Sequence, residues 1–157
     1  MIRKEIIKRL TKSNETIATM ESCTGGGVAN AITNQPGASA VLKYSAVTYS
    51  NEYKIKMGVS KETIDKYTVY SQETADAMAK AISDFANSSY GVGITGKLNK
   101  KDPANPAGDD NVVYVTIYER KTNTYHNLKL EVENQTRREN KEFIIRKINE
   151  MLLNIVK

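Results

Sequence analysis

Strand-like and helix-like segments alternate along this chain of 157 residues, and that alternation restricts the fold more than any other feature. A short β-prone run at 16–20 leads into a glycine-rich turn at 21–27, and apolar residues at helical spacing resume at 28–32. Alternating strands and helices favour a partly parallel sheet that carries helices on both faces. Because ligands bind such sheets beyond the carboxyl ends of the strands, we expect a site in the turns that follow the strands.

The rest of the chain extends this pattern to the order αβαβααβββα. Predicted helices cover 2–12, 28–32, 61–67, 72–87 and 137–156, and predicted strands cover 16–20, 44–49, 90–95, 112–118 and 125–132. The last two strands form an antiparallel hairpin, and the polar, proline-containing residues 97–111 form an irregular loop. The length predicts a single domain. Three turns are expected to converge at one edge of the sheet: 22–27, 51–54 and the segment from Thr95 onward.

The composition excludes several classes of partner and site. The net charge is +5, but the basic residues are scattered, so a nucleic-acid partner is not expected. One cysteine and one histidine are too few for a tetrahedral zinc site, and a lone cysteine fits a reducing compartment. Apolar runs are too short for a membrane span, and the charged first residues do not form a secretory signal. We therefore expect a cytoplasmic protein with no membrane partner.

The turn at 22–27 has two explanations. Glycines let a ligand approach the backbone, and a helix start presents N–H groups that bind an anion such as phosphate. A tight turn that requires positive φ explains the same glycines without a ligand. Cys23 in this turn is either a thiolate nucleophile, which a helix N-terminus favours, or a small buried side chain, which is the commoner case.

A serine nucleophile would need a base elsewhere in the chain. The single histidine, His126, lies in a predicted edge strand without an evident carboxylate relay, which argues against a Ser-His-Asp triad. A lysine whose pKa is depressed by burial can replace histidine, and Lys54, just past a predicted buried strand, is the best-placed lysine. From local spacing alone, Ser39 is explained as a helix N-cap and Lys54 as a solvated side chain.

Several motifs together resemble one known family. They are Glu21-Ser22-Cys23-Thr24-Gly25-Gly26, Pro36-Gly37-Ala38-Ser39-Ala40-Val41, Thr48-Tyr49-Ser50-Asn51-Glu52 with Lys54, Gly58-Val59, and Ser71-Gln72-Glu73-Thr74-Ala75. In this order and spacing, over roughly residues 1–96, the chain resembles the CinA C-terminal domain family. The resemblance implies an α/β fold, a three-layer α/β/α sandwich with a mixed, mostly parallel sheet and an antiparallel C-terminal hairpin. It also implies a single CinA C-terminal-like domain over 1–157.

The family includes nicotinamide mononucleotide deamidases, and the resemblance therefore implies a reaction. It implies an amidohydrolase that converts nicotinamide mononucleotide to nicotinate mononucleotide and ammonia, without metal or cofactor. The family's serine–lysine pair maps to Ser39 as nucleophile and Lys54 as base. Tyr49 is expected as a third catalytic residue that hydrogen-bonds Lys54 or the leaving amine, and Ser22 and Cys23 stay open as alternative nucleophiles. The partner expected is a small molecule, a pyridine nucleotide. The residues expected to contact it are Ser22, Thr24, Gly25, Gly26, Thr95 and Gly96.

The second half of the chain departs from the family pattern. The family's glycine-rich stretch after Thr-Gly is replaced by Lys97-Leu98-Asn99-Lys100-Lys101-Asp102-Pro103, whose lysines either attract a phosphate or are solvated. The family's Gly-Asp-Arg is replaced near 134–137, where Arg137 and Arg138 are the candidates for the lost arginine. The alternative function is therefore a degenerate, non-catalytic nucleotide-binding module of the same fold. Tyrosines such as Tyr44 and Tyr53 offer aromatic surface for a homo-oligomer, with core packing as their other use.

Overall fold

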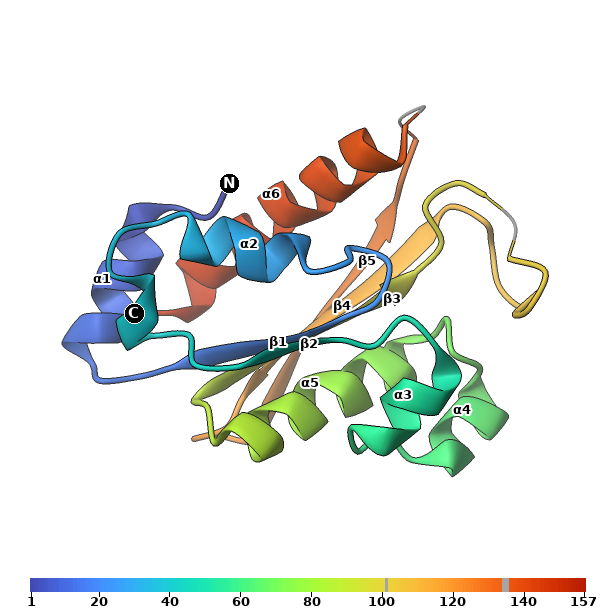
Figure 1. Cartoon of the computed structure of the whole chain (residues 1–157), viewed down its shortest axis with the longest axis horizontal. Coiled ribbons are helices and arrows are strands. Elements are labelled where there is room, and N and C mark those ends of the chain that lie inside the picture. Colours follow the sequence, from blue (N-terminus) through green and yellow to red (C-terminus); the bar gives the residue numbers. More distant parts are fainter. Residues whose placement is uncertain (101, 134–135) are drawn as a thin grey trace.

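One mixed sheet forms the centre of the protein. The computed structural model describes residues 1–100, 102–133 and 136–157 (Figure 1), so Lys101 and part of the 134–137 segment lie outside the described residues. The strands are β1 (Ile17–Glu21), β2 (Ser45–Val47), β3 (Tyr90–Gly96), β4 (Val112–Glu119) and β5 (Thr124–Glu131), in the spatial order β2-β1-β3-β4-β5. β1, β2 and β3 are parallel, whereas β4 is antiparallel to β3 and β5 to β4. The predicted mixed sheet with an antiparallel C-terminal hairpin is confirmed.

Helices cover both faces of the sheet (Figure 1). One layer contains α1 (Lys4–Lys12), α2 (Gly27–Thr33) and α6 (Arg137–Ile155), and the opposite layer contains α3 (Asn51–Lys56), α4 (Lys61–Tyr67) and α5 (Gln72–Ala86). A short 3-10 helix, η1 (Ala38–Ala40), precedes β2. The expected three-layer α/β/α sandwich is confirmed. Within the described ranges, no helix is both long and apolar enough to cross a membrane.

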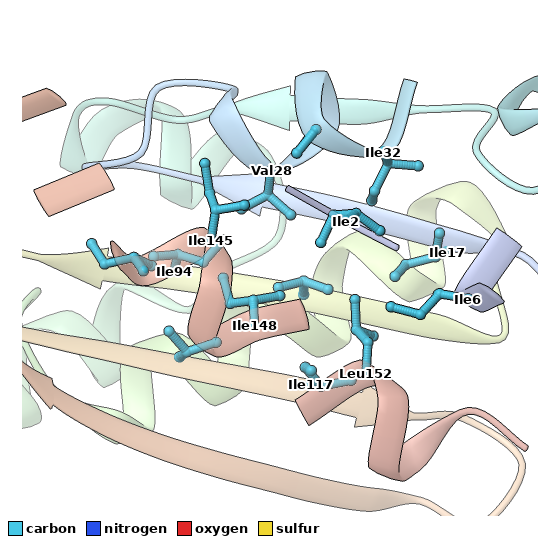
Figure 2. Packing of buried hydrophobic residues seen from close by; sticks show 14 of the residues in the cluster. Ile2, Ile6, Ile17, Val28, Ile32, Ile94, Ile117, Ile145, Ile148 and Leu152 are labelled. Atoms are coloured by element: carbon cyan, nitrogen blue, oxygen red, sulfur yellow. The ribbon is translucent and has the colours of Figure 1, made fainter. Parts of the chain in front are cut away.

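Isoleucines dominate the core between the sheet and the layer of α1, α2 and α6. Figure 2 shows Ile6 of α1, Val28 of α2 and Leu152 of α6 packed in one buried cluster with strand residues such as Ile17 and Ile117. A smaller buried cluster lies on the opposite face and includes residues of α4 and α5. Burying each large aliphatic side chain contributes about 1.5–3 kcal/mol, so these helices are stable because their apolar faces pack on the sheet.

One helix was expected to be a turn. α3 begins after Ser50, whose hydroxyl accepts a hydrogen bond from the N–H of Tyr53 at 3.3 Å. α3 has six residues, and its buried residue is Lys54. Helix prediction depends on an apolar stripe, and a short helix that buries a lysine has no such stripe.

β3 and α5 approach each other closely because β3 contains glycine. A Cβ atom built on Gly93 would lie 2.3 Å from the carbonyl oxygen of Ala75, and one built on Gly91 would lie 2.0 Å from that of Ala79. Only glycine fits at these two positions. The contact holds α5 against the strand whose carboxyl end, at Gly96, belongs to the site described below.

Gly93→Ala is therefore expected to lower the free energy of unfolding by about 1–3 kcal/mol, because the new methyl group collides with the α5 backbone. Gly27→Ala is the control, since its Cβ would meet only the terminal Cδ1 atom of Ile145, at 3.1 Å. Urea unfolding followed by circular dichroism measures both variants. Equal stability of the two would contradict the close approach of β3 and α5.

Candidate active site

A cavity of about 670 Å³ opens at the carboxyl edge of the three parallel strands. Ser22 and Cys23, which follow β1, line this cavity together with Gly96 at the end of β3. Tyr49 and Asn51, which follow β2, line it as well, and residues of 96–100 and 102–105 supply much of the remaining wall. The predicted convergence of three turns at one sheet edge is confirmed.

Glu21, the last residue of β1, is fully buried and organises the turn after it. Its carboxylate accepts hydrogen bonds from the hydroxyl groups of Thr24 at 2.6 Å and Thr19 at 3.0 Å. It also accepts from the backbone N–H groups of Val28 and Ala29, each at 2.9 Å. The carboxylate therefore caps α2, where its negative charge interacts favourably with the helix dipole.

Because Glu21 caps α2, the phosphate site that was expected in the same turn is not supported. The N–H groups at the start of α2 already bind the Glu21 carboxylate, and a phosphate there would be repelled by that buried charge. Gly25 and Gly26 have φ angles of +60° and +93°, the left-handed conformation that a tight turn requires. Thr24, Gly25 and Gly26 thus form the turn, and the explanation without a ligand accounts for them. Glu21 was part of a quoted motif, but nothing in that motif predicted its role as the cap.

Lys54 on α3 contacts Ser22, which follows β1 and lines the cavity. The Lys54 side chain is 2% exposed, and its Nζ donates hydrogen bonds to Ser22 Oγ at 3.0 Å and to the Thr48 carbonyl at 2.8 Å. Burial lowers the pKa of Lys54 from 10.5 to about 8, because removal from water disfavours the ammonium form; nearby Cys23 and Asp102 oppose the shift. A hydroxyl thus lies within hydrogen-bond reach of an amine that is partly neutral near physiological pH, the arrangement that activates a serine.

The expected Ser39–Lys54 pair is not formed. Ser39 lies exposed in η1, two residues before Val41, whose carbonyl accepts a hydrogen bond from the N–H of Ile17 at the start of β1. Ser22 follows the end of the same strand, and five residues of strand span about 16 Å. Ser39 therefore lies near the amino ends of the parallel strands, whereas Ser22 lies at their carboxyl ends. Strand β2 runs between Ser39 and α3 (Figure 1). Of the serines considered, the structure brings Ser22 to Lys54.

Cys23 is unsuited to act as the nucleophile. Its side chain is buried, and burial raises the pKa of the thiol to about 12, although Lys54 opposes the shift. The thiolate is the reactive form, and little of it exists at neutral pH with such a pKa. Cys23 therefore matches the small buried side chain that was the alternative explanation.

Some of the other expected site residues line the cavity, whereas others have contacts that differ from those predicted. Tyr49 is exposed at the cavity rim, and its hydroxyl accepts a hydrogen bond from Nη2 of Arg137 at 3.0 Å rather than contacting Lys54. Thr95 is buried and donates to the Val69 carbonyl at 2.9 Å, so it joins β3 to the segment before α5. Gly96 does line the cavity. Of the two candidate arginines, Arg137 lines the cavity, whereas Arg138 pairs with Glu142 on the surface.

Asp102 and Asn105, in the part of the chain that departs from the family pattern, line the cavity and are held by contacts that the sequence did not predict. The Tyr70 hydroxyl donates to the Asp102 carboxylate, which also accepts from the Asn105 side chain at 3.3 Å and the Ala104 N–H at 3.0 Å. The Asn51 side chain donates to Asn105 at 3.1 Å, which joins the loop to α3. Burial and then the contact with Asp102 raise the pKa of Tyr70, and the same hydrogen bond lowers the pKa of Asp102. No periodic pattern marks the Tyr70–Asp102 and Asn51–Asn105 pairs, because each of these two pairs joins segments far apart in the sequence.

Basic side chains surround the outer part of the cavity. Lys97, Lys100 and Arg137 line it, and Lys97 is buried with its Nζ 3.5 Å from Asp110 and 5.0 Å from the centroid of the Tyr70 ring. Such groups favour an anionic ligand. Across the described ranges, no group of three or more His, Cys, Asp or Glu side chains is placed to hold a metal ion.

A family model of the CinA C-terminal domain matches residues 1–156. The chain belongs to the CinA C-terminal domain family. A relative from Clostridium botulinum (strain Kyoto / Type A2), named "Putative competence-damage inducible protein", is 45% identical over 97 residues, 61% of this chain and 24% of the relative. This CinA-family chain spans about a quarter of the length of the curated relatives it matches.

Solved structures share the fold of this CinA-family chain. The competence/damage inducible protein CihA from Agrobacterium tumefaciens aligns with 100% of this chain and 99% of its own, with a TM-score of 0.83 and 26% identity. A competence or damage-inducible protein from Enterobacter asburiae aligns with 98% of this chain and 97% of its own, with a TM-score of 0.85 and 23% identity. The names of these proteins state no reaction, and the cavity described above is the part of this CinA domain that indicates its chemistry.

The buried lysine makes the stability of the fold depend on pH. Below about pH 8 both the folded and the unfolded chain hold the Lys54 proton, and the folded state carries the full burial penalty. Between about pH 8 and 10.5 only the unfolded chain keeps the proton, so rising pH stabilises the fold. Relative to Lys54→Met, which cannot titrate, the natural chain should gain about 3 kcal/mol across this window. Urea unfolding of both proteins at several pH values measures the difference, and a constant difference would contradict the lowered pKa.

Proposed function

We propose that the chain is a serine–lysine amidohydrolase that deamidates nicotinamide mononucleotide to nicotinate mononucleotide and ammonia. The observation that carries the proposal is the 3.0 Å contact between Nζ of the buried Lys54 and Oγ of Ser22, which lines the cavity. The substrate follows from membership of the CinA family and from the resemblance of its motifs to those of the deamidases. The nucleophile differs from the one that the motifs alone suggested, because Ser22 and not Ser39 contacts the lysine.

The reaction begins when neutral Lys54 takes the proton of Ser22 and Ser22 Oγ attacks the carboxamide carbon. The amide N–H of Ser22 is occupied, since it donates to the Ile94 carbonyl at 3.1 Å. The N–H groups that follow in the turn, those of Cys23 and Thr24, are therefore the donors proposed for the oxyanion. The Lys54 ammonium then protonates the leaving nitrogen, and ammonia departs from an acyl-serine. A water molecule, deprotonated by Lys54, attacks the acyl group, and the carboxylate product and free Ser22 are formed.

The cavity also suits the size and charge of a mononucleotide. Its volume of about 670 Å³ falls within the usual range of small-molecule sites, about 300–1,000 Å³. Arg137 and Lys100 at its outer wall are the groups proposed to bind the phosphate, which replaces the site expected at the α2 turn. In this arrangement the amide lies at the floor and the phosphate near the rim.

A non-catalytic nucleotide-binding module is the second candidate. One observation favours it: Asp102 and Asn105, in the part of the chain that departs from the family pattern, are hydrogen-bonded to Tyr70 and Asn51, which line the same cavity. A loop held in this way can retain a ligand without allowing its turnover. Binding of nicotinamide mononucleotide without ammonia release would favour this module over the amidohydrolase.

Substitution of either member of the pair should remove the activity. Ser22→Ala lacks the nucleophile and Lys54→Met lacks the base, so each is expected to lower kcat for ammonia release by about 10³-fold or more. Ser39→Ala is the matched control and should keep the activity of the natural chain, because Ser39 lies at the other edge of the sheet. An ammonia-release assay with nicotinamide mononucleotide measures all three. Full activity in Ser22→Ala, or its loss in a folded Ser39→Ala variant, would refute the Ser22–Lys54 pair.

The rate should rise with pH as Lys54 loses its proton. Only the neutral amine can accept the serine proton, so kcat/KM for nicotinamide mononucleotide is expected to increase through a midpoint near pH 8. At one pH unit below that midpoint, about a tenth of the enzyme is active. Initial rates across the alkaline range give the profile, and a rate that is flat through this range would exclude Lys54 as the base.

A further inference from the structure

We propose that Asp102 selects amides carried on a positively charged ring, with Tyr70 as the residue that positions its carboxylate. This inference rests on the proposed function, because it places the amide of the substrate at Ser22. It adds a determinant of specificity in the part of the chain that departs from the family pattern.

The charge distribution in the cavity is the first argument. Among the cavity-lining residues that the structure describes, Asp102 is the one carboxylate, whereas Lys97, Lys100 and Arg137 are basic. Asp110, just outside the lining, lies 3.5 Å from Lys97 and offsets part of its charge. The cavity therefore presents one carboxylate among three basic side chains. This distribution of charge complements a ligand with one cationic and one anionic part.

The contacts of Asp102 are the second argument. Its oxygens accept hydrogen bonds from the Tyr70 hydroxyl, the Asn105 side chain and the Ala104 N–H, which hold the carboxylate in place and ionised. A quaternary ring nitrogen carries no N–H and needs no free lone pair on its partner. It needs only a fixed negative charge nearby, which is what a carboxylate with occupied oxygens still provides.

The distance from Asp102 to the reacting groups is the third argument. Asp102 and Tyr70 line the same cavity as Ser22, whose Oγ contacts Lys54 Nζ. The charge of Asp102 opposes the lowering of the Lys54 pKa, so Asp102 lies within electrostatic range of the reacting groups. In a nicotinamide ring a single carbon separates the charged nitrogen from the carbon that bears the amide. When the amide lies at Ser22, the ring charge consequently falls within range of Asp102.

The test compares two ligands that differ in ring charge. Nicotinamide mononucleotide has a cationic ring, whereas its reduced form has a neutral dihydropyridine ring with the same amide, ribose and phosphate. Calorimetry on the folded Ser22→Ala background measures binding without turnover. Asp102→Asn should raise the Kd of the cationic ligand about tenfold and leave that of the neutral ligand unchanged. Asp109→Asn, an exposed aspartate of the same loop, is the matched control and should alter neither.

Tyr70→Phe tests the positioning role. In the otherwise natural chain it should raise KM for nicotinamide mononucleotide by less than Asp102→Asn does, with kcat unchanged, because the carboxylate stays charged but loses one anchor. Equal losses for both ligands in Asp102→Asn, or no loss for either, would overturn the inference. A fall in kcat at constant KM in Tyr70→Phe would overturn the positioning role.

A second pair of ligands separates this inference from the proposed function. Calorimetry with the 1-methylnicotinamide cation and with neutral nicotinamide requires no hydrolysis. If the protein releases no ammonia from nicotinamide mononucleotide but prefers the cation in a manner that Asp102→Asn abolishes, the function fails and the subsite stands. If the protein hydrolyses nicotinamide mononucleotide and Asp102→Asn changes neither KM nor cation binding, the subsite fails and the function stands.

Discussion

The buried carboxylate of Glu21 is the interaction on which the rest of the site depends. A buried carboxylate is tolerable only when its oxygens are hydrogen-bonded, so the chain after β1 has to wrap around it and direct the hydroxyl of Thr24 and the first N–H groups of α2 at it. That wrapping requires the left-handed conformations of Gly25 and Gly26. It places Ser22 at the cavity floor, while the backbone carbonyl of Glu21 binds the N–H of Thr48 beside Lys54. Glu21, through its side chain and its backbone carbonyl, thereby joins β1, α2 and the surroundings of the lysine.

Lys54 shows how this fold exchanges stability for reactivity. A lysine with a 2% exposed side chain is costly in its charged form, and two hydrogen bonds compensate only part of the cost. The remaining free-energy cost of the buried charge lowers the pKa of Lys54. The lowered pKa would also let the amine accept a proton from Ser22. The same burial that weakens the fold at neutral pH therefore supplies the base of the proposed reaction, a conflict that is typical of functional sites.

Prediction succeeded where the physics is local and periodic. α5 and α6 follow from apolar residues at helical spacing, and the β4–β5 hairpin follows from two β-prone runs joined by a short turn. It failed at α3, where the buried residue is a lysine, and at Ser39. Ser39 and Lys54 are fifteen positions apart, but this separation does not reveal that β2 runs between them. Because of β2, the two residues lie at opposite ends of the parallel strands. The contacts of Tyr70 with Asp102 and of Asn51 with Asn105 likewise join segments that no sequence pattern relates.

The amino-acid sequence alone determined the α/β class, the family and the edge of the sheet at which a site would lie, because hydrophobic period, glycine placement and motif order are properties of the chain itself. Tertiary structure decided which serine meets the lysine, that the α2 N-terminus binds Glu21 instead of a phosphate, and that the loop at 97–111 brings a carboxylate into the cavity. Those outcomes depend on distances between segments far apart in the chain and on burial, and burial is what changes the pKa of Lys54. Neither quantity exists until the sheet and its two helix layers have assembled.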